Sequence, residues 1–258
     1  MMTIRDRFMN SKKKMKVGKI ILISFISFLL IAVCAFLIYV SNYYHADKIA
    51  IEASKDKGIN ISNINGALVF DPGNADTALI FYQGGKVEYT AYEPLMIKIA
   101  QKGILCILPK MPFNLAVFDI NAANKHISQN TKIQHWYMGG HSLGGSMAAS
   151  YASKNIGKVE GLILLASYST ADISSNGMRV LSIYGSKDGV LNKESYQKNK
   201  SKLPADFMEI VLPGGNHAGF GCYGPQQGDG KADITSEQQQ TDTSQAIAEF
   251  CLKVKSNE

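Results

Sequence analysis

The sequence has little cysteine and no metal-binding motif. Its 258 residues include four cysteines and five histidines, with no pair spaced as C-x-x-C or H-x-x-x-H. A zinc site of the usual spacing and a disulfide framework are therefore not indicated, and we predict no metal and no cofactor. Cys34 lies in the long apolar run at 20–40, and Cys106 lies in a second, shorter apolar run, where a buried thiol is expected. Cys222 and Cys251 are left as the one pair that an exported domain would allow to join.

An excess of positive charge is lacking in most of the chain. Seven of the 27 basic residues, but only one of the 21 acidic residues, lie in residues 1–19. The remainder carries 20 of each sign, so its net charge is zero. A nucleic-acid partner is not indicated, because a binding surface for nucleic acid would leave a basic balance in the folded part.

What the sequence does contain is one long apolar run. Residues 20–40 include no charged side chain. As a helix these 21 residues would reach about 30 Å, which is enough to cross the hydrocarbon core of a bilayer. We predict an uncleaved signal anchor, with residues 1–19 as a basic cytoplasmic tail and everything after Val40 outside the cell membrane.

Three other interpretations of this run were weighed. A cleaved signal peptide fits the basic start, but no small-x-small site follows in residues 41–45. The stretch Ile31–Cys34 is similar to a lipoprotein cleavage box, although Val33 stands where a small residue is needed. A buried helix of a soluble domain would need protein on all sides.

After the span, apolar runs alternate with helical patterns. We assign residues 41–65 to a juxtamembrane linker with a short helix at 47–57, and residues 66–258 to one domain. Strands are predicted at 67–70, 77–82, 104–108, 133–138, 162–166, 180–184 and 208–212, and helices at 91–102, 121–129, 143–150 and 236–254. Strands that are apolar throughout indicate a mainly parallel sheet with helices on both faces, an α/β fold whose active site lies at the carboxyl ends of the strands.

One of these strands runs into the stretch Gly140-His141-Ser142-Leu143-Gly144, which matches G-x-S-x-G. In this motif a serine sits in a strained turn between strand and helix, and its hydroxyl is lifted off the sheet edge. Glycines at 140 and 144 are expected because a Cβ there would collide with the neighbouring strand and helix. The free N–H of Leu143, at the start of the helix, points to where an oxyanion would form.

Two further strands end next to residues that complete this chemistry. Asp188 follows the strand that ends at Tyr184, and His217 follows the strand that ends at Leu212. His217 would take the proton of Ser142, and Asp188 would orient the imidazole. Asp172 is the competing candidate for the acid, because it too follows a strand. The other histidines, at positions 45, 126, 135 and 141, are interpreted as structural or solvated.

The order Ser142, Asp188, His217 is that of the α/β-hydrolases. Over residues 66–252 the sequence resembles this family, in its small serine type. It is similar to a bacterial branch in which Tyr-x-Gly-Gly-Lys-Val follows the third strand and Gly-Gly-Asn-His carries the base. The resemblance implies an α/β-hydrolase fold and a second oxyanion donor at Gly85. Gln83 departs from the proline expected in that branch.

Only residues 167–179 separate the strand after the nucleophile helix from the strand before the acid, so no lid domain is predicted. We therefore expect an open site and a serine carboxylesterase acting on small or surface-exposed esters. Two alternatives stay open at this point. The same triad can pass an acyl group to an envelope alcohol, and a membrane-tethered binding protein can keep the fold without catalysis.

Overall fold

The computed structural model describes residues 4–53 and 58–252, which fall into two units, 1–42 and 43–258. In the first, helix α1 (Ile4–Ser41) contains the predicted span. Its segment Lys16–Ser41 includes an 18-residue window with a mean hydropathy of 3.0, and no residue of that window is buried by protein. Among the described residues it is the one helix long and apolar enough to cross a membrane, properties that a signal sequence shares.

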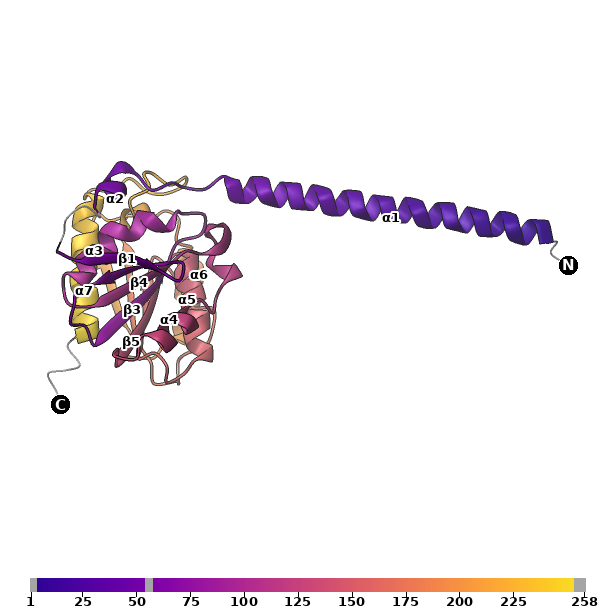
Figure 1. Ribbon diagram of the computed structural model, residues 1–258. Coiled ribbons are helices and arrows are strands. Elements are labelled where there is room, and N and C mark those ends of the chain that lie inside the picture. The colour runs from indigo at the N-terminus through magenta and orange to yellow at the C-terminus, as the bar shows by residue number, and fades with distance from the viewer. Residues whose placement is uncertain (1–3, 54–57, 253–258) are drawn as a thin grey trace. The chain divides into compact units, whose positions relative to one another are not determined.

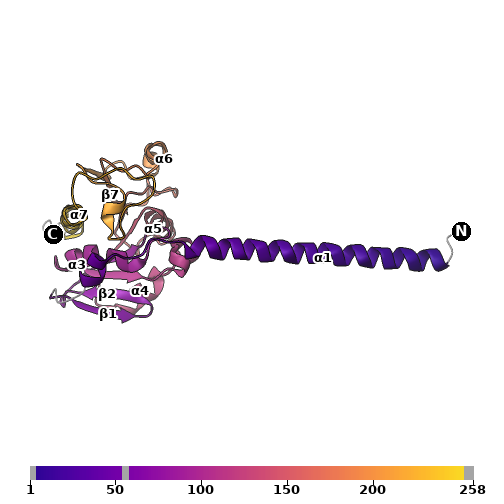
Figure 2. The same ribbon diagram turned by 90° about the horizontal axis from the view of Figure 1, so that it is seen from above.

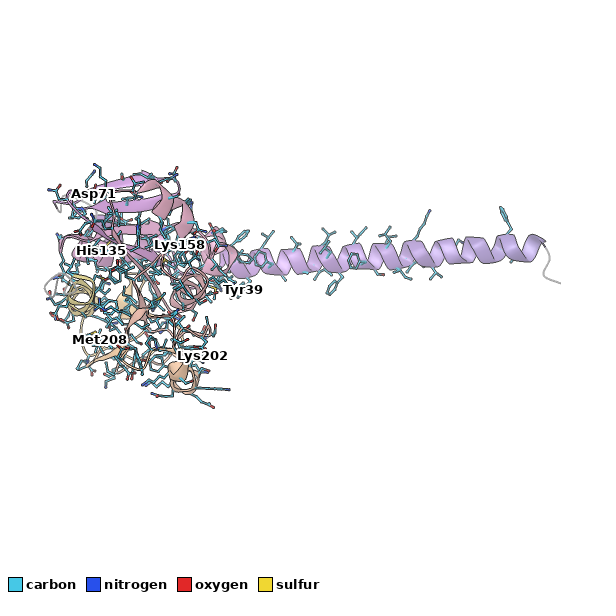
Figure 3. The ribbon with its side chains drawn as sticks, turned by 90° about the horizontal axis from the view of Figure 1, so that it is seen from below. Tyr39, Asp71, His135, Lys158, Lys202 and Met208 are labelled. Carbon is cyan, nitrogen blue, oxygen red and sulfur yellow. The ribbon has the colours of Figure 1, made fainter. Side chains whose placement is uncertain are left out.

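The second unit is built on an eight-stranded sheet in the order β1-β2-β4-β3-β5-β6-β7-β8. Strands β1 and β2 run antiparallel to their neighbours, and the pairs from β4 to β8 are parallel. In Figure 3, Asp71 on β2 and Met208 on β8 lie toward the two opposite edges of this sheet. The strands are β1 (Asn60–Ile64), β2 (Ala67–Asp71), β3 (Thr77–Tyr82), β4 (Leu105–Pro109), β5 (His135–His141), β6 (Gly161–Leu165), β7 (Arg179–Gly185) and β8 (Met208–Leu212).

Helices cover both faces of the sheet, as Figures 1 and 2 show. Successive side chains of a strand point to opposite faces of the sheet, so the apolar strands contribute side chains to two separate hydrophobic cores. One core lies under α3 (Glu93–Ala100) and α7 (Ser236–Leu252), and the other under α4 (Ala123–Gln129) and α5 (Leu143–Lys154). The predicted α/β class with helices on both faces is confirmed.

Several elements differ from the sequence-based prediction. One strand was expected in residues 58–73, but β1 and β2 form a hairpin there, so residues 60–64 of the predicted linker belong to the sheet. Helix α6 (Lys193–Asn199) was missed, since its seven residues are mostly polar. The helix predicted at 91–102 is a 3-10 turn (Tyr89–Tyr92) followed by α3. Helix α2 (Lys48–Ala53) covers the described part of the helix predicted at 47–57, and residues 253–254 of the last predicted helix lie outside the described residues.

The start of the second unit is joined to the loop after β3. Tyr44 donates its N–H to the carbonyl of Lys86 and accepts the N–H of Glu88, both at 2.8 Å. Its hydroxyl accepts the N–H of Gln227 at 3.1 Å. Residues next to α1 in the sequence are therefore built into the carboxyl edge of the sheet, where the candidate site lies.

Candidate active site

Ser142 lies in the sharp turn between β5 and α5. Its backbone has φ 51° and ψ −122°, a conformation that costs energy for a residue with a Cβ. The turn is held by the Ser142 N–H, which donates to the carbonyl of Leu165 at 2.9 Å. The hydroxyl of Ser167 donates in turn to the Ser142 carbonyl at 2.7 Å. These bonds keep the serine at the end of its strand in the strained geometry of a nucleophile elbow.

The glycines on either side of Ser142 allow the first turn of α5 to lie against two strand ends. A Cβ on Gly140 would stand 2.5 Å from the carbonyl carbon of Gly144. A Cβ on Gly144 would collide with the carbonyl oxygens of Tyr82 and Gln83 at the end of β3. The steric reason predicted from the sequence therefore holds for both glycines.

Asp188 and His217 come from neighbouring strand ends and contact each other. Asp188 follows β7, His217 follows β8, and the Nδ1 of His217 lies 2.9 Å from the Oδ2 of Asp188. The other carboxylate oxygen accepts the N–H groups of Val190 and Leu191 at 2.9 and 2.8 Å. Burial raises the pKa of Asp188, but the hydrogen bond and charge of His217 and these two N–H groups outweigh it and lower the pKa below its usual value. The acid is therefore held as a carboxylate that faces the imidazole.

The far nitrogen of His217 is free to act as a base. Both side chains of the pair are buried, and the Nε2 of His217 has no hydrogen-bond partner among the described residues. In the tautomer that donates from Nδ1 to the carboxylate, the lone pair of the ring lies on Nε2. His217 and Ser142 line the same pocket of about 260 Å³, together with Leu143, Ala166 and Val190.

The predicted oxyanion donors also lie side by side. A Cβ on Gly85 would be 2.9 Å from the Cδ2 of Leu143, so the glycine loop rests directly on the first residue of α5. The Leu143 N–H belongs to the first turn of a helix, where backbone donors have no partner within the helix. Among the described residues, the Gly85 N–H makes no backbone hydrogen bond. Two backbone donors are thus available next to Ser142.

The side chain of Gln83 holds this glycine loop in place through hydrogen bonds. Its side chain is fully buried, and its Nε2 donates to the carbonyl of Val87 at 2.9 Å and to the Oδ1 of Asn114 at 3.1 Å. Its Oε1 accepts the N–H of Met111 at 3.4 Å. At the position where the resembled branch is expected to have a proline, this chain therefore has an amide side chain that joins the glycine loop to residues 111–114.

Tyr92 and His141 form a buried pair behind the site that the sequence did not predict. The Tyr92 hydroxyl accepts the N–H of Gly84 at 3.0 Å and lies 2.8 Å from the Nδ1 of His141. The ring centroids of His141 and His217 are 4.5 Å apart. Burial, and after it the neighbouring His217, lowers the pKa of His141 well below its usual value. A neutral His141 therefore packs against the ring of His217.

The remaining candidates are placed elsewhere. The Oδ1 of Asp172 accepts the N–H and the hydroxyl of Ser174, and the side chain is exposed rather than turned to His217. Cys222 and Cys251 are both buried and free, so the disulfide left open by the sequence is not formed. No group of three or more His, Cys, Asp or Glu in the described part of the chain is placed to hold a metal ion.

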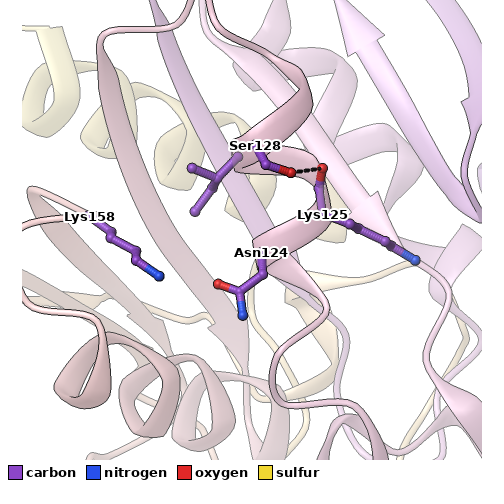
Figure 4. Close-up of a pocket in the computed structure, with 5 residues that line it drawn as sticks. Asn124, Lys125, Ser128 and Lys158 are labelled. Atoms are coloured by element: carbon purple, nitrogen blue, oxygen red, sulfur yellow. Dashed lines mark hydrogen bonds between the residues drawn. The ribbon is translucent and has the colours of Figure 1, made fainter.

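A second hollow lies at α4 (Figure 4), and none of the candidate site residues lines it. Its volume is about 490 Å³, and it is lined by Asn124, Lys125, Ile127, Ser128 and Lys158. The one hydroxyl in it, that of Ser128, donates to the Lys125 carbonyl at 3.0 Å. No acid or imidazole lines this hollow, so it lacks the groups that activate a serine.

The comparison with protein families decides the class of this chain. The model of the alpha/beta hydrolase family matches residues 78–241, which contain every residue of the candidate site. The chain belongs to the alpha/beta hydrolase family. Membership in the family supports hydrolase activity, and the resemblance to the α/β-hydrolases stated from the sequence is confirmed at the level of the family.

Solved structures similar to this hydrolase share its fold at low identity. A dienelactone hydrolase from Anabaena variabilis has a TM-score of 0.55 and 14% identity, over 74% of this chain and 96% of its own. Est1E from Butyrivibrio proteoclasticus has a TM-score of 0.52 and 14% identity, over 76% and 98%. TT1662 from Thermus thermophilus has a TM-score of 0.51 and 12% identity, over 62% and 91%. A search of curated proteins finds no match.

Proposed function

We propose that this alpha/beta hydrolase is a membrane-anchored serine carboxylesterase that acts on small or surface-exposed esters. The observation that carries the proposal is the state of His217. One ring nitrogen is bonded to the Asp188 carboxylate, and the other is buried in the pocket that Ser142 shares, with no hydrogen-bond partner in the described part of the chain. An imidazole held in this way is a general base for the serine hydroxyl.

The proposed reaction proceeds in two halves. The Oγ of Ser142 attacks the ester carbonyl carbon while the Nε2 of His217 takes the hydroxyl proton, and the Asp188 carboxylate stabilises the imidazolium. The N–H groups of Leu143 and Gly85 hold the developing oxyanion. The imidazolium returns its proton to the alcohol as the ester bond breaks. Water, deprotonated by His217, then releases the acid from Ser142 through the same steps in reverse.

The proposed preference for small acyl groups rests on the pocket. About 260 Å³ lies beside Ser142, which is at the low end for sites that enclose an organic ligand. Residues 166–178 between β6 and β7 contain no helix, so no lid domain stands over the pocket to cover a long chain. A short acyl group fits this space, while the alcohol part of the ester would remain outside.

Activity on p-nitrophenyl esters tests this assignment. We expect the full-length protein in detergent to be labelled by a fluorophosphonate and to hydrolyse the acetate faster than the octanoate, by about tenfold or more in kcat/KM. A preference for the octanoate would contradict the proposed pocket. Labelling without hydrolysis, with acyl transfer to an added alcohol, would favour the acyltransferase alternative, and no labelling at all would favour a binding protein.

The proposed anchor rests on α1, whose apolar segment Lys16–Ser41 has a basic segment before it. We expect the protein to stay in the membrane fraction after extraction at alkaline pH, at its full length of 258 residues. In intact cells, added protease should digest residues 43–258 and spare the N-terminal tail. A shortened product released from the membrane would instead show that the segment is a cleaved signal peptide.

A further inference from the structure

One carboxylate outside the proposed triad contacts both loops that carry its acid and its base. The Oδ1 of Asp229 accepts the N–H of Gly189 at 3.1 Å, next to the acid, and the N–H of His217 itself at 3.2 Å. It also accepts the N–H of Gly230 at 2.8 Å, and the Oδ2 accepts the N–H of Ala218 at 2.8 Å. Four backbone donors from three segments thus converge on one side chain.

The backbone around Asp229 lies directly on the acid loop. A Cβ on Gly189 would stand 2.6 Å from the carbonyl oxygen of Gly228 and 2.9 Å from the nitrogen of Gly230. A Cβ on Gly230 would collide with the carbonyl of Lys187. Glycine on each side of this contact allows the segment 228–230 to approach the acid loop at the level of Asp188.

The same segment is fastened to the base loop. The Nδ2 of Asn216 donates to the carbonyl of Gly230 at 2.8 Å. The N–H of Asn216 donates to the Oε1 of Gln239 at 3.0 Å, and the Nε2 of Gln239 donates to the carbonyl of Asn216 at 2.8 Å. The base loop is thus held between α7 and the segment that carries Asp229.

We infer that Asp229 is a positioning residue that sets the distance and angle between Asp188 and His217. This inference rests on the proposed function. Asp188 and His217 come from two different strands, so a bond of 2.9 Å between them needs the two loops to be fixed to each other. The charged carboxylate does so through hydrogen bonds stronger than those of a neutral acceptor. Asp229 does not line the pocket of Ser142, so it acts through the pair and not on the substrate.

The test replaces the carboxylate by its isosteric amide in the full-length protein. In Asp229→Asn one oxygen becomes an NH₂ group, which cannot accept a backbone N–H. We expect kcat for p-nitrophenyl acetate to fall by about 10- to 100-fold while KM changes by less than about twofold, because the proton transfer is misaligned and the pocket is not. The rate of fluorophosphonate labelling should fall by the same factor. The matched control is Asp71→Asn, a half-buried carboxylate that accepts one loop N–H from Gly73.

A second variant keeps the carboxylate and moves the backbone. Gly230→Ala places a methyl group against the Lys187 carbonyl and should lower kcat in the same direction, with KM again kept. Both variants are assayed well below their thermal midpoints. A kcat equal to that of Asp71→Asn in both, or a rise in KM with kcat kept, would overturn the inference. Activity retained in Ser142→Ala would contradict the proposed function itself. That result does not depend on Asp229→Asn or Gly230→Ala, which test the positioning role alone.

Discussion

Replacing Ser142 by alanine should lower kcat for p-nitrophenyl acetate by about 10⁴-fold or more, which is the effect of removing the nucleophile of a serine triad. The loss is expected because Ser142 is the pocket serine that lies in a strained turn. The other two serines that line the pocket, Ser146 and Ser167, donate their hydroxyls to backbone carbonyls at 2.7 Å. Fluorophosphonate labelling should disappear as well. The fold should remain, because alanine keeps a Cβ and so occupies the same backbone conformation at similar cost.

Ser153→Ala is the matched control, since Ser153 lies on the same helix and its hydroxyl donates only to the Ser150 carbonyl at 3.0 Å. This variant should keep wild-type turnover and labelling. Far-UV circular dichroism and the thermal midpoint should agree among the wild type and both variants. Labelling that persists in Ser142→Ala would mean that another residue is the nucleophile.

Replacing Asp188 by asparagine should reduce kcat by about 10⁴-fold while KM changes little. An amide NH₂ in place of the Oδ2 would donate to Nδ1, so the ring would carry its proton on Nε2 and could not accept the serine proton. Stopped or continuous assays of p-nitrophenol release at pH 7.5 measure the change.

Asp172→Asn is the decisive companion variant, because both aspartates follow strands of the sheet. Asp172 makes only a local turn with Ser174 at the surface. Its replacement should leave kcat within about twofold of the wild type. The opposite outcome, loss of activity in Asp172→Asn and retention in Asp188→Asn, would reassign the acid.

Local sequence predicted the elements of the fold well wherever packing and propensity act together. Strands β3 and β6 are almost entirely apolar, and β5 has apolar and aromatic residues before its two glycines. All three strands are buried on both faces. Elements at the margin of the sheet were harder to predict. Strand β1 (Asn60–Ile64) is polar and half exposed, and it is a strand only because β2 pairs with it. Helix α6 has one buried residue, Tyr196, so its sequence lacks the apolar stripe that indicates an amphipathic helix.

For the candidate site, too, local sequence predicted some features and missed others. The G-x-S-x-G stretch predicts its own backbone geometry, because two glycines and a serine between a strand and a helix are compatible with few backbone conformations. The role of Gln83 was not predictable, since the partners of its amide lie at Val87, Met111 and Asn114. Asp229 was missed for a similar reason. Its loop is rich in glycine and polar residues, and nothing in it indicates that its carboxylate meets two strand ends.

By itself the sequence determined the α/β class, the apolar N-terminal helix and the elbow at Ser142, because each depends on residues that are neighbours along the chain. The family followed from the order of Ser142, Asp188 and His217, which the sequence also contains. Tertiary structure alone decided that Asp188 and not Asp172 faces His217, that Cys222 and Cys251 stay apart, and that Asp229 joins the two loops. Those outcomes depend on distances between segments brought together by the packing of the sheet and its helices, and such distances have no signature in local sequence.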